Sequence, residues 1–183
     1  MGQQINAPYI NLNVMILKRT LFIILLAGFS FTGRAQSLTH VNLLVSNDRA
    51  AVASIDVTNS NNLYSVDLRG HANPKANADN NLNIAYYTDA DGPDNIGKLK
   101  SIGNITVTYY TQFDGPDNIG KLKSIGNVAI AYYTQYDGFD NIGKLKTIGS
   151  TTITYYDRFD ISQPTGTIKS IDGNTPCLNI INF

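Results

Sequence analysis

The feature that most constrains this chain is an internal repeat with a fixed period of 23 residues. The stretch GPDNIGKLKSIGN at 92–104 recurs without change at 115–127, and a third version, GFDNIGKLKTIGS, occupies 138–150. A short fixed period indicates an architecture in which each unit is one supersecondary element, stacked on its neighbours to bury a continuous core. A Tyr-Tyr pair marks each unit, at 86–87, 109–110, 132–133 and 155–156.

Each unit predicts a β-hairpin with a long and a short strand. The segment NVAIAYYTQYD at 127–137 alternates between apolar and polar residues, which is typical of a strand with one buried face. GKLKSI at 120–125 predicts the shorter strand, and the loop between such strands is rich in turn formers. The predicted buried face of the long strand carries Val128, Ile130, Tyr132, Thr134 and Tyr136.

The turn after the short strand sets the register of the hairpin. A two-residue Gly126-Asn127 turn would place Lys123 on the apolar face beside Ile130 if the strands alternate strictly. A three-residue loop from Ile125 to Asn127 would instead pair Leu122 with Ile130 and move the lysines to the polar face. We therefore predict the three-residue loop.

Composition agrees with an all-β chain, because its 14 acidic residues are all Asp and it contains no Glu. We predict an antiparallel meander of stacked 23-residue hairpins that forms a twisted, curled sheet. A closed β-barrel and a solenoid are the alternatives. The apolar face of the predicted sheet must be covered. The sheet can curl on itself, or it can pack against strands near 40–68 and the last segment, CLNIINF.

The N-terminal residues predict an export signal. Lys18 and Arg19 precede the apolar TLFIILLAGFSFTG, and Gly33 and Ala35 fit the −3 and −1 positions of a cleavage site before Gln36. Met15 is the better-placed start, so we expect residues 1–35 to be a signal peptide with a start assigned too early. The apolar run is short for a membrane span, and we expect none in the mature chain. The predicted location is the periplasm, the cell surface or the extracellular space.

The mature chain, 36–183, is predicted to be one β-repeat domain. Clear repeats cover about 82–172, degenerate copies cover 41–81, and 173–183 is a C-terminal segment. Removing residues 1–35 takes away three of the 14 basic residues and leaves 11 against 14 Asp, a net charge of −3. This balance disfavours nucleic acid as a partner. The single Cys177 offers no intrachain disulfide.

The GKLKSIG segments and the YY…DG…GKLK pattern resemble two kinds of secreted β-hairpin repeat, the YD-type repeats and the MORN-variant repeats. Choline-binding repeats also contain a Tyr-Tyr hairpin, but this chain has no Trp for their ligand cage. The resemblance covers roughly 82–172. It implies a hairpin array and no functional residue.

The Asp-rich loops are the first candidate for chemistry. Carboxylate-rich loops supply the oxygen ligands that calcium requires, although Asp beside Gly and Pro is also what an ordinary turn uses. The spacing DADGPDN matches neither the EF-hand nor the glycine-rich nonapeptide repeat. The calcium candidates are Asp89, Asp91, Asp94, Asp114, Asp117, Asp137 and Asp140.

The predicted polar face is the second candidate. It carries tyrosines in a row beside lysines of the short strands, which suits a glycan or a surface protein as partner. The alternative is cross-strand packing, with lysines covering tyrosines to solubilise the sheet. The ligand-binding candidates are Tyr87, Tyr110, Tyr133, Tyr156, Lys100, Lys123 and Lys146.

No catalytic motif is present in the sequence. His40 and His71 are the only histidines, and neither lies in a clear repeat. We therefore expect no enzyme, no catalytic residue and no cofactor. The leading hypothesis is an exported structural or adhesive repeat protein. The alternatives are a glycan- or protein-binding module and a calcium-stabilised array.

Overall fold

The computed structural model describes residues 37–59, 62–69, 71–75 and 82–182. The chain divides into two compact units, Met1–Gly33 and Arg34–Phe183, and every described residue belongs to the second. The predicted export segment therefore lies outside the described residues. Within the described part, regular structure consists of strands and short 3-10 turns, and no helix there has the length and apolar character to cross a membrane.

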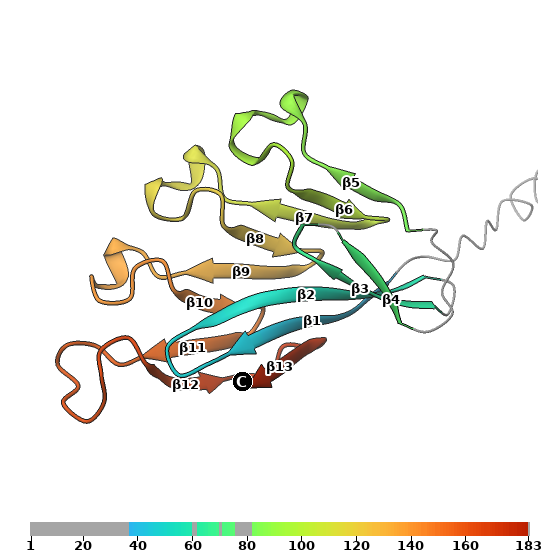
Figure 1. Ribbon diagram of the computed structural model, residues 1–183. Helices are drawn as coiled ribbons and strands as arrows, with labels where there is room; N and C mark the ends of the chain where they lie inside the picture. Colours follow the sequence, from blue (N-terminus) through green and yellow to red (C-terminus); the bar gives the residue numbers. More distant parts are fainter. Residues whose placement is uncertain (1–36, 60–61, 70, 76–81, 183) are drawn as a thin grey trace, which may run out of the picture. The chain divides into compact units, whose positions relative to one another are not determined.

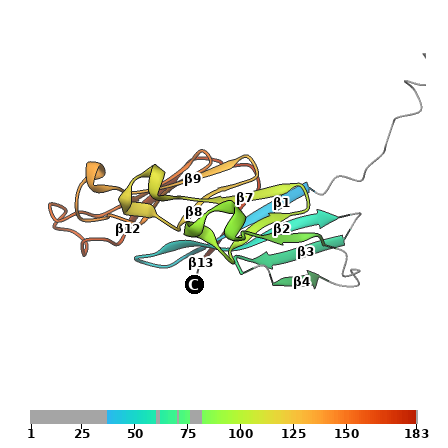
Figure 2. The same cartoon turned by 90° about the horizontal axis from the view of Figure 1, so that it is seen from above.

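Five strands form a mixed sheet in the order β13-β1-β2-β3-β4 (Figure 1). β13 pairs in parallel with β1, and the other neighbours are antiparallel. Figure 2 shows β1, β2 and β3 side by side. This sheet contains the described part of the segment predicted to hold degenerate copies, together with the C-terminal segment. Its strands are β1 Ser37–Val45, β2 Ala50–Asn59, β3 Asn62–Asp67, β4 Ala72–Lys75 and β13 Leu178–Asn182.

Eight further strands form the predicted antiparallel meander, which is confirmed. Each strand pairs with the next along the chain, so β5 and β12 are the two edges, and the sheet does not close into a barrel as one alternative had it. Its strands are β5 Ile84–Tyr86, β6 Leu99–Ile102, β7 Ile105–Tyr109, β8 Leu122–Ile125, β9 Val128–Tyr132, β10 Leu145–Ile148, β11 Thr151–Tyr155 and β12 Ile168–Asp172.

The two sheets share one hydrophobic core. Apolar residues of both sheets belong to this one buried cluster, so the apolar face of the meander is covered by the other sheet. One backbone hydrogen bond also joins them, from Ile168 N to Asn47 O at 2.7 Å. Core residues with no exposed surface are Leu43, Ile55, Val57 and Val66 of the mixed sheet and Leu99, Ile102, Val107, Ile125, Ile148 and Ile153 of the meander.

The predicted three-residue hairpin loop is wrong. Ile125 pairs with Val128 and Ser124 with Ala129, which leaves a two-residue Gly126-Asn127 turn. Gly126 has a φ of 57°, whereas Asn127 does not enter the left-handed region. A left-handed glycine at the first central position is the requirement of a type II′ turn. The second position then tolerates any ordinary residue, so Ser150 fits there in the third unit.

A β-bulge keeps the lysine out of the core despite this turn. Thr108 pairs with Ser124 and Tyr109 with Leu122, so Lys123 is an extra residue on its strand. A bulge of this kind resets the alternation of side chains. Leu122 and Ile125 are therefore both buried although they are three residues apart. The same irregularity recurs in the other three units, at Lys100, Lys146 and Lys169.

The long strands are shorter than predicted because each ends at the first tyrosine of its pair. In the first three units the next residues form 3-10 turns. The aspartate that ends the first of these turns accepts hydrogen bonds from a threonine three residues earlier, as Asp114 does from Thr111 N at 2.9 Å. This position, here called the first aspartate of the loop, is occupied by Asp91, Asp114, Asp137 and Asp160. Tyr136, predicted to lie on the buried strand face, therefore lies in a turn and is exposed. The turns are η1 Asp89–Asp91, η2 Pro93–Asn95, η3 Gln112–Asp114, η4 Pro116–Asn118 and η5 Gln135–Asp137.

Candidate functional site

The second tyrosine of each pair meets the second lysine of its own unit, as the predicted polar face required. The lysine Nζ lies between 5.3 and 5.6 Å from the centre of the ring, a cation–π distance. The same Nζ donates to the first aspartate of the loop, and this contact lowers the pKa of that carboxyl. The trios are Tyr87-Lys100-Asp91, Tyr110-Lys123-Asp114, Tyr133-Lys146-Asp137 and Tyr156-Lys169-Asp160.

The hydroxyl of the second tyrosine reaches the next unit. Tyr110 Oη donates to Ile130 O at 2.9 Å, and its ring meets Tyr132 edge-on with centroids 6.1 Å apart. Tyr87 and Tyr133 repeat both contacts with the units that follow them. The predicted tyrosine row is thus half-buried and joins one hairpin to the next.

In the first three units the lysine immediately before the short strand, here called the first lysine, also serves the next unit. It therefore does not share the predicted polar-face role of the second lysine. Lys121 Nζ donates to Asn118 Oδ1 and to Gly143 O, each at 2.9 Å. It also lies 5.0 Å from the ring centre of Tyr132. Burial lowers the pKa of Lys121 and raises that of Tyr132 to about 12. Lys98 makes the corresponding contacts one unit earlier.

The second aspartate of each loop accepts a backbone N–H from the next loop. Asp94 Oδ2 accepts from Gln112 N at 3.1 Å, and Asp117 Oδ2 accepts from Gln135 N at 3.0 Å. The calcium candidates are therefore engaged by lysines, threonines and backbone amides, except Asp89. Among the described residues no group of three or more His, Cys, Asp or Glu side chains is placed to hold a metal ion. Calcium stabilisation stays a hypothesis, which melting with and without a chelator tests.

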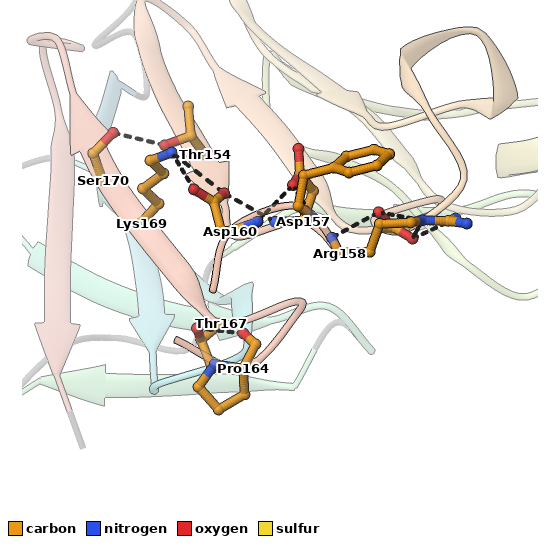
Figure 3. Close-up of polar contacts among 10 residues, drawn as sticks. Thr154, Asp157, Arg158, Asp160, Pro164, Thr167, Lys169 and Ser170 are labelled. Atoms are coloured by element: carbon orange, nitrogen blue, oxygen red, sulfur yellow. Dashed lines mark hydrogen bonds and ion pairs between the residues drawn. The ribbon is translucent and has the colours of Figure 1, made fainter. Parts of the chain in front are cut away.

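The last unit shows which repeated residues serve a following unit. Gln163 replaces the second aspartate and Thr167 replaces the first lysine, and Thr167 bonds within its own loop to Pro164 O (Figure 3). Asp160 and Lys169, which contact each other within the unit, are retained (Figure 3). Residues that would reach a fifth hairpin are lost, and residues that support their own hairpin remain. Most of the repeated polar pattern is therefore explained by the array itself.

A row of exposed aromatic side chains escaped the sequence analysis. The position before the first aspartate, here called the tip position, lies at the end of each loop, and Figure 1 shows these loops on one side of the meander. Its side chain is 90% exposed at Phe113, 90% at Tyr136 and 82% at Phe159. Aligning the units by their aspartates would have shown this column. Its members are Ala90, Phe113, Tyr136 and Phe159.

A cleft of about 380 Å³ separates the third loop, between β9 and β10, from the fourth loop, between β11 and β12. Phe139, 74% exposed, and Phe159 line it. Arg158 also lines it, and its Nε and Nη2 lie 2.9 and 2.6 Å from Asp140 Oδ1. The Arg158 guanidinium lowers the pKa of the Asp140 carboxyl. Figure 3 shows Arg158 next to Asp157 on the fourth loop, with its contacts to the Asp140 carboxylate as dashed lines.

Known proteins offer no guide to this surface. No family model matches the chain, and neither the curated proteins nor the solved structures contain a significant match. The resemblance to hairpin-repeat families stays an expectation. Function must be argued from the geometry of the loops and strands.

The histidines form no enclosed site. His71 Nδ1 lies 3.0 Å from Asp67 Oδ2, but the His71 side chain is 71% exposed. Burial raises the pKa of Asp67, yet hydrogen bonds from His71 and Arg69 outweigh it and lower the pKa overall. His40 is also exposed. Neither ring lines the cleft between the third and fourth loops.

Proposed function

We propose that the protein is an exported, non-enzymatic adhesive module that holds a ligand or surface along the loop tips of its repeat array. The observation that carries the proposal is the exposure of the aromatic tip residues Phe113, Tyr136 and Phe159. Large apolar side chains gathered on one edge of a folded protein indicate an interaction surface. Here the same edge recurs in each unit, so the apolar groups stand in a row.

The array is suited to multivalent attachment. Successive loops are two strands apart, about 10 Å at the usual strand spacing. Rigid spacing lets several weak contacts act on one extended partner, and the combined affinity then exceeds that of any single contact. The inter-unit contacts of Tyr110 and Lys121 support a rigid spacing, because they tie each hairpin to its neighbour.

The polar face of tyrosines and lysines supports a structural role. The hydroxyl of Tyr133 is committed to Ile153 O, and Lys146 is committed to Asp137. A glycan or a protein bound there would have to displace these contacts. The tip row has no such commitment, since its aromatic side chains extend into solvent.

A retention assay tests the proposal. The purified protein is applied to insoluble cellulose, insoluble chitin, zwitterionic vesicles, anionic vesicles and collagen-coated plates. The variant carries Phe113→Ala, Tyr136→Ala and Phe159→Ala, and alanine is the residue that the first unit already has at this position. We expect at least one surface to retain the protein and the variant to bind it about tenfold less.

Ile181→Thr is the control, because Ile181 is an exposed apolar residue of β13 and lies outside the loops. It should bind like the parent protein, and circular dichroism should show the same fold for all three proteins. Equal retention of the parent protein and the triple variant on every surface would refute the tip row as an adhesive surface.

The exported location rests on the sequence of residues 15–36. Cell fractionation followed by N-terminal sequencing tests it. We expect the mature protein to begin at Gln36 and to be found outside the cytoplasm. A cytoplasmic protein that keeps residues 15–35 would contradict this part of the proposal.

A further inference from the structure

The third and fourth loops depart from an otherwise strict repeat, and their departures meet in one cleft. Phe139 stands where the first two units have Pro93 and Pro116. Arg158 stands where the two preceding units have Gln112 and Gln135. Both changed side chains line the cleft of about 380 Å³ between these loops.

A gain in stability does not explain why Phe139 replaces the proline of the first two units. Proline fixes φ and restricts the unfolded chain, which favours the fold at a compatible position. Its replacement removes the 3-10 turn seen at Pro116–Asn118, since the third loop has only an irregular turn at this place. The new ring is 74% exposed and therefore gains little from burial. A change that weakens the local fold without packing in return points to a functional site.

Arg158 is held in a defined orientation. Besides the two guanidinium contacts to Asp140, its own backbone N donates to Asp140 Oδ2 at 3.0 Å. Its side chain is still 56% exposed, so guanidinium N–H groups remain for a ligand. The cleft thus offers aromatic faces at Phe139 and Phe159 beside an ordered array of donors and carboxylate acceptors.

The third loop also differs from the first two in the hydrogen bonding of one conserved asparagine, which lines this cleft. Asn141 is buried, with 9% of its surface exposed, and its Oδ1 has no hydrogen-bond partner among the described residues. In the two earlier units the equivalent oxygens, of Asn95 and Asn118, each accept from a lysine Nζ.

We propose, on the basis of the adhesive function above, that the cleft between the third and fourth loops binds a sugar residue of a neutral, extended β-linked glycan. Pyranose rings present apolar C–H faces that pack on aromatic rings, and their hydroxyls match mixed donors and acceptors. The volume lies in the usual range of small-ligand sites.

Charge and spacing select this ligand. The cleft is lined by Asp137, Asp140 and Asp157. Lys146 pairs with Asp137 and Arg158 pairs with Asp140, so the carboxylate of Asp157 leaves one net negative charge, which disfavours an acidic glycan or an anionic lipid surface. The tip row repeats about every 10 Å, which is of the order of a disaccharide repeat in a flat β-linked chain. A sugar in the cleft would therefore let its neighbours lie along Tyr136 and Phe113.

Calorimetric titration of the full protein tests the proposal. Cellohexaose and chitohexaose are the neutral probes, and a hyaluronan hexasaccharide is the acidic comparator. We expect one neutral oligosaccharide per chain, with the acidic one bound at least about tenfold more weakly. Phe139→Pro and Arg158→Gln restore the residues of the sister units, so both variants should fold, and each should weaken neutral binding about tenfold.

A gain-of-function variant tests the site more stringently than the two loss-of-binding variants. Pro116→Phe combined with Gln135→Arg copies both departures to the equivalent positions of the second and third loops, and the stoichiometry should rise from one to two. A stoichiometry that stays at one in this variant would refute the proposed site. An affinity for the neutral oligosaccharide that is unchanged by Phe139→Pro and Arg158→Gln would also refute it. Preference for the acidic probe does the same.

The outcomes separate this inference from the proposed function. If the tip row mediates retention on vesicles or on collagen while neither neutral oligosaccharide binds, the adhesive function stands and the glycan site falls. If the tip row mediates no retention on any surface, both fall.

Discussion

The strand base of each repeat unit and its loop tip follow opposite rules. At the base, residues such as Ile125 and Lys121 contact the neighbouring unit, and each is repeated almost without change. At the tip, the side chain before the first aspartate changes from Ala90 to Phe113 and Tyr136 while the backbone turn is preserved. The base is constrained by its neighbours in the array, and the tip is not.

This contrast tells where to look for function in a duplicated protein. Repeated residues show what the array needs to assemble, and the last unit confirms it by losing Asp and Lys at the two positions that would serve a fifth hairpin. Exposed residues that differ between units are free of that demand. Phe139 and Arg158 therefore carry more functional information than the identical residues around them.

The largest expected effect compares two isoleucines of one unit, Ile125 at the strand base and Ile119 in the loop. Ile125 is fully buried, whereas Ile119 is 47% exposed. Ile125→Ala should lower the free energy of unfolding by about 2–5 kcal/mol through lost burial and a cavity. Ile119→Ala should lower it by less than about 1 kcal/mol. Urea denaturation followed by circular dichroism measures both.

Equal losses at the two positions would break the distinction between strand base and loop. The m-value provides a check on the measurement, because an unchanged slope shows that the variants unfold to the same exposed state as the parent protein.

A smaller effect compares two equivalent tyrosines. Tyr133 donates to Ile153 O of the next unit at 3.0 Å, whereas Tyr156 has no following unit and makes no hydroxyl hydrogen bond among the described residues. Tyr133→Phe should cost about 1 kcal/mol, the usual net value of one hydrogen bond. Tyr156→Phe should be close to neutral.

Both substitutions remove one oxygen and keep the ring over its lysine, so each controls for the other. A loss at Tyr156 as large as that at Tyr133 would show that the hydroxyl acts within its own unit and does not join neighbouring units.

Much of the fold was predictable from period and alternation. A repeat of 23 residues with one alternating segment specifies a hairpin, and like hairpins pair with like, so the antiparallel meander followed. The pairing of Lys100 with Tyr87 and of Lys123 with Tyr110 also followed, because residues on adjacent strands meet at short range.

The register was not predictable by the same rules. Strict alternation made a two-residue turn look unfavourable for Lys123, and only the bulge at that residue resolves the conflict. Bulges leave no simple mark in a sequence, since any residue can occupy them. The strand end was missed for a related reason. Tyr136 continues the alternating pattern, and the turn that exposes it depends on hydrogen bonds between Thr134 and Asp137.

The smallest expected effect concerns the ion pair that supports each tip from its own base. Lys123 holds the pKa of Asp114 below its ordinary value through a hydrogen bond 2.5 Å long, and Thr111 N adds to the effect. A carboxyl with a depressed pKa in the folded state stabilises the fold above its unfolded pKa of about 3.9. That contribution is lost as the pH falls through the folded pKa.

Asp114→Asn tests this dependence through the melting temperature between pH 7 and pH 2.5. The variant should melt slightly below the parent protein at pH 7, and the difference should shrink as the pH falls below the unfolded pKa, because the parent carboxyl becomes protonated. Asp89→Asn is the control, because the Asp89 carboxylate makes no hydrogen bond or ion pair in the described part of the chain. A constant difference across the whole range would mean that Asp114 acts through its hydrogen bonds alone, so that charge does not couple the tip to the base.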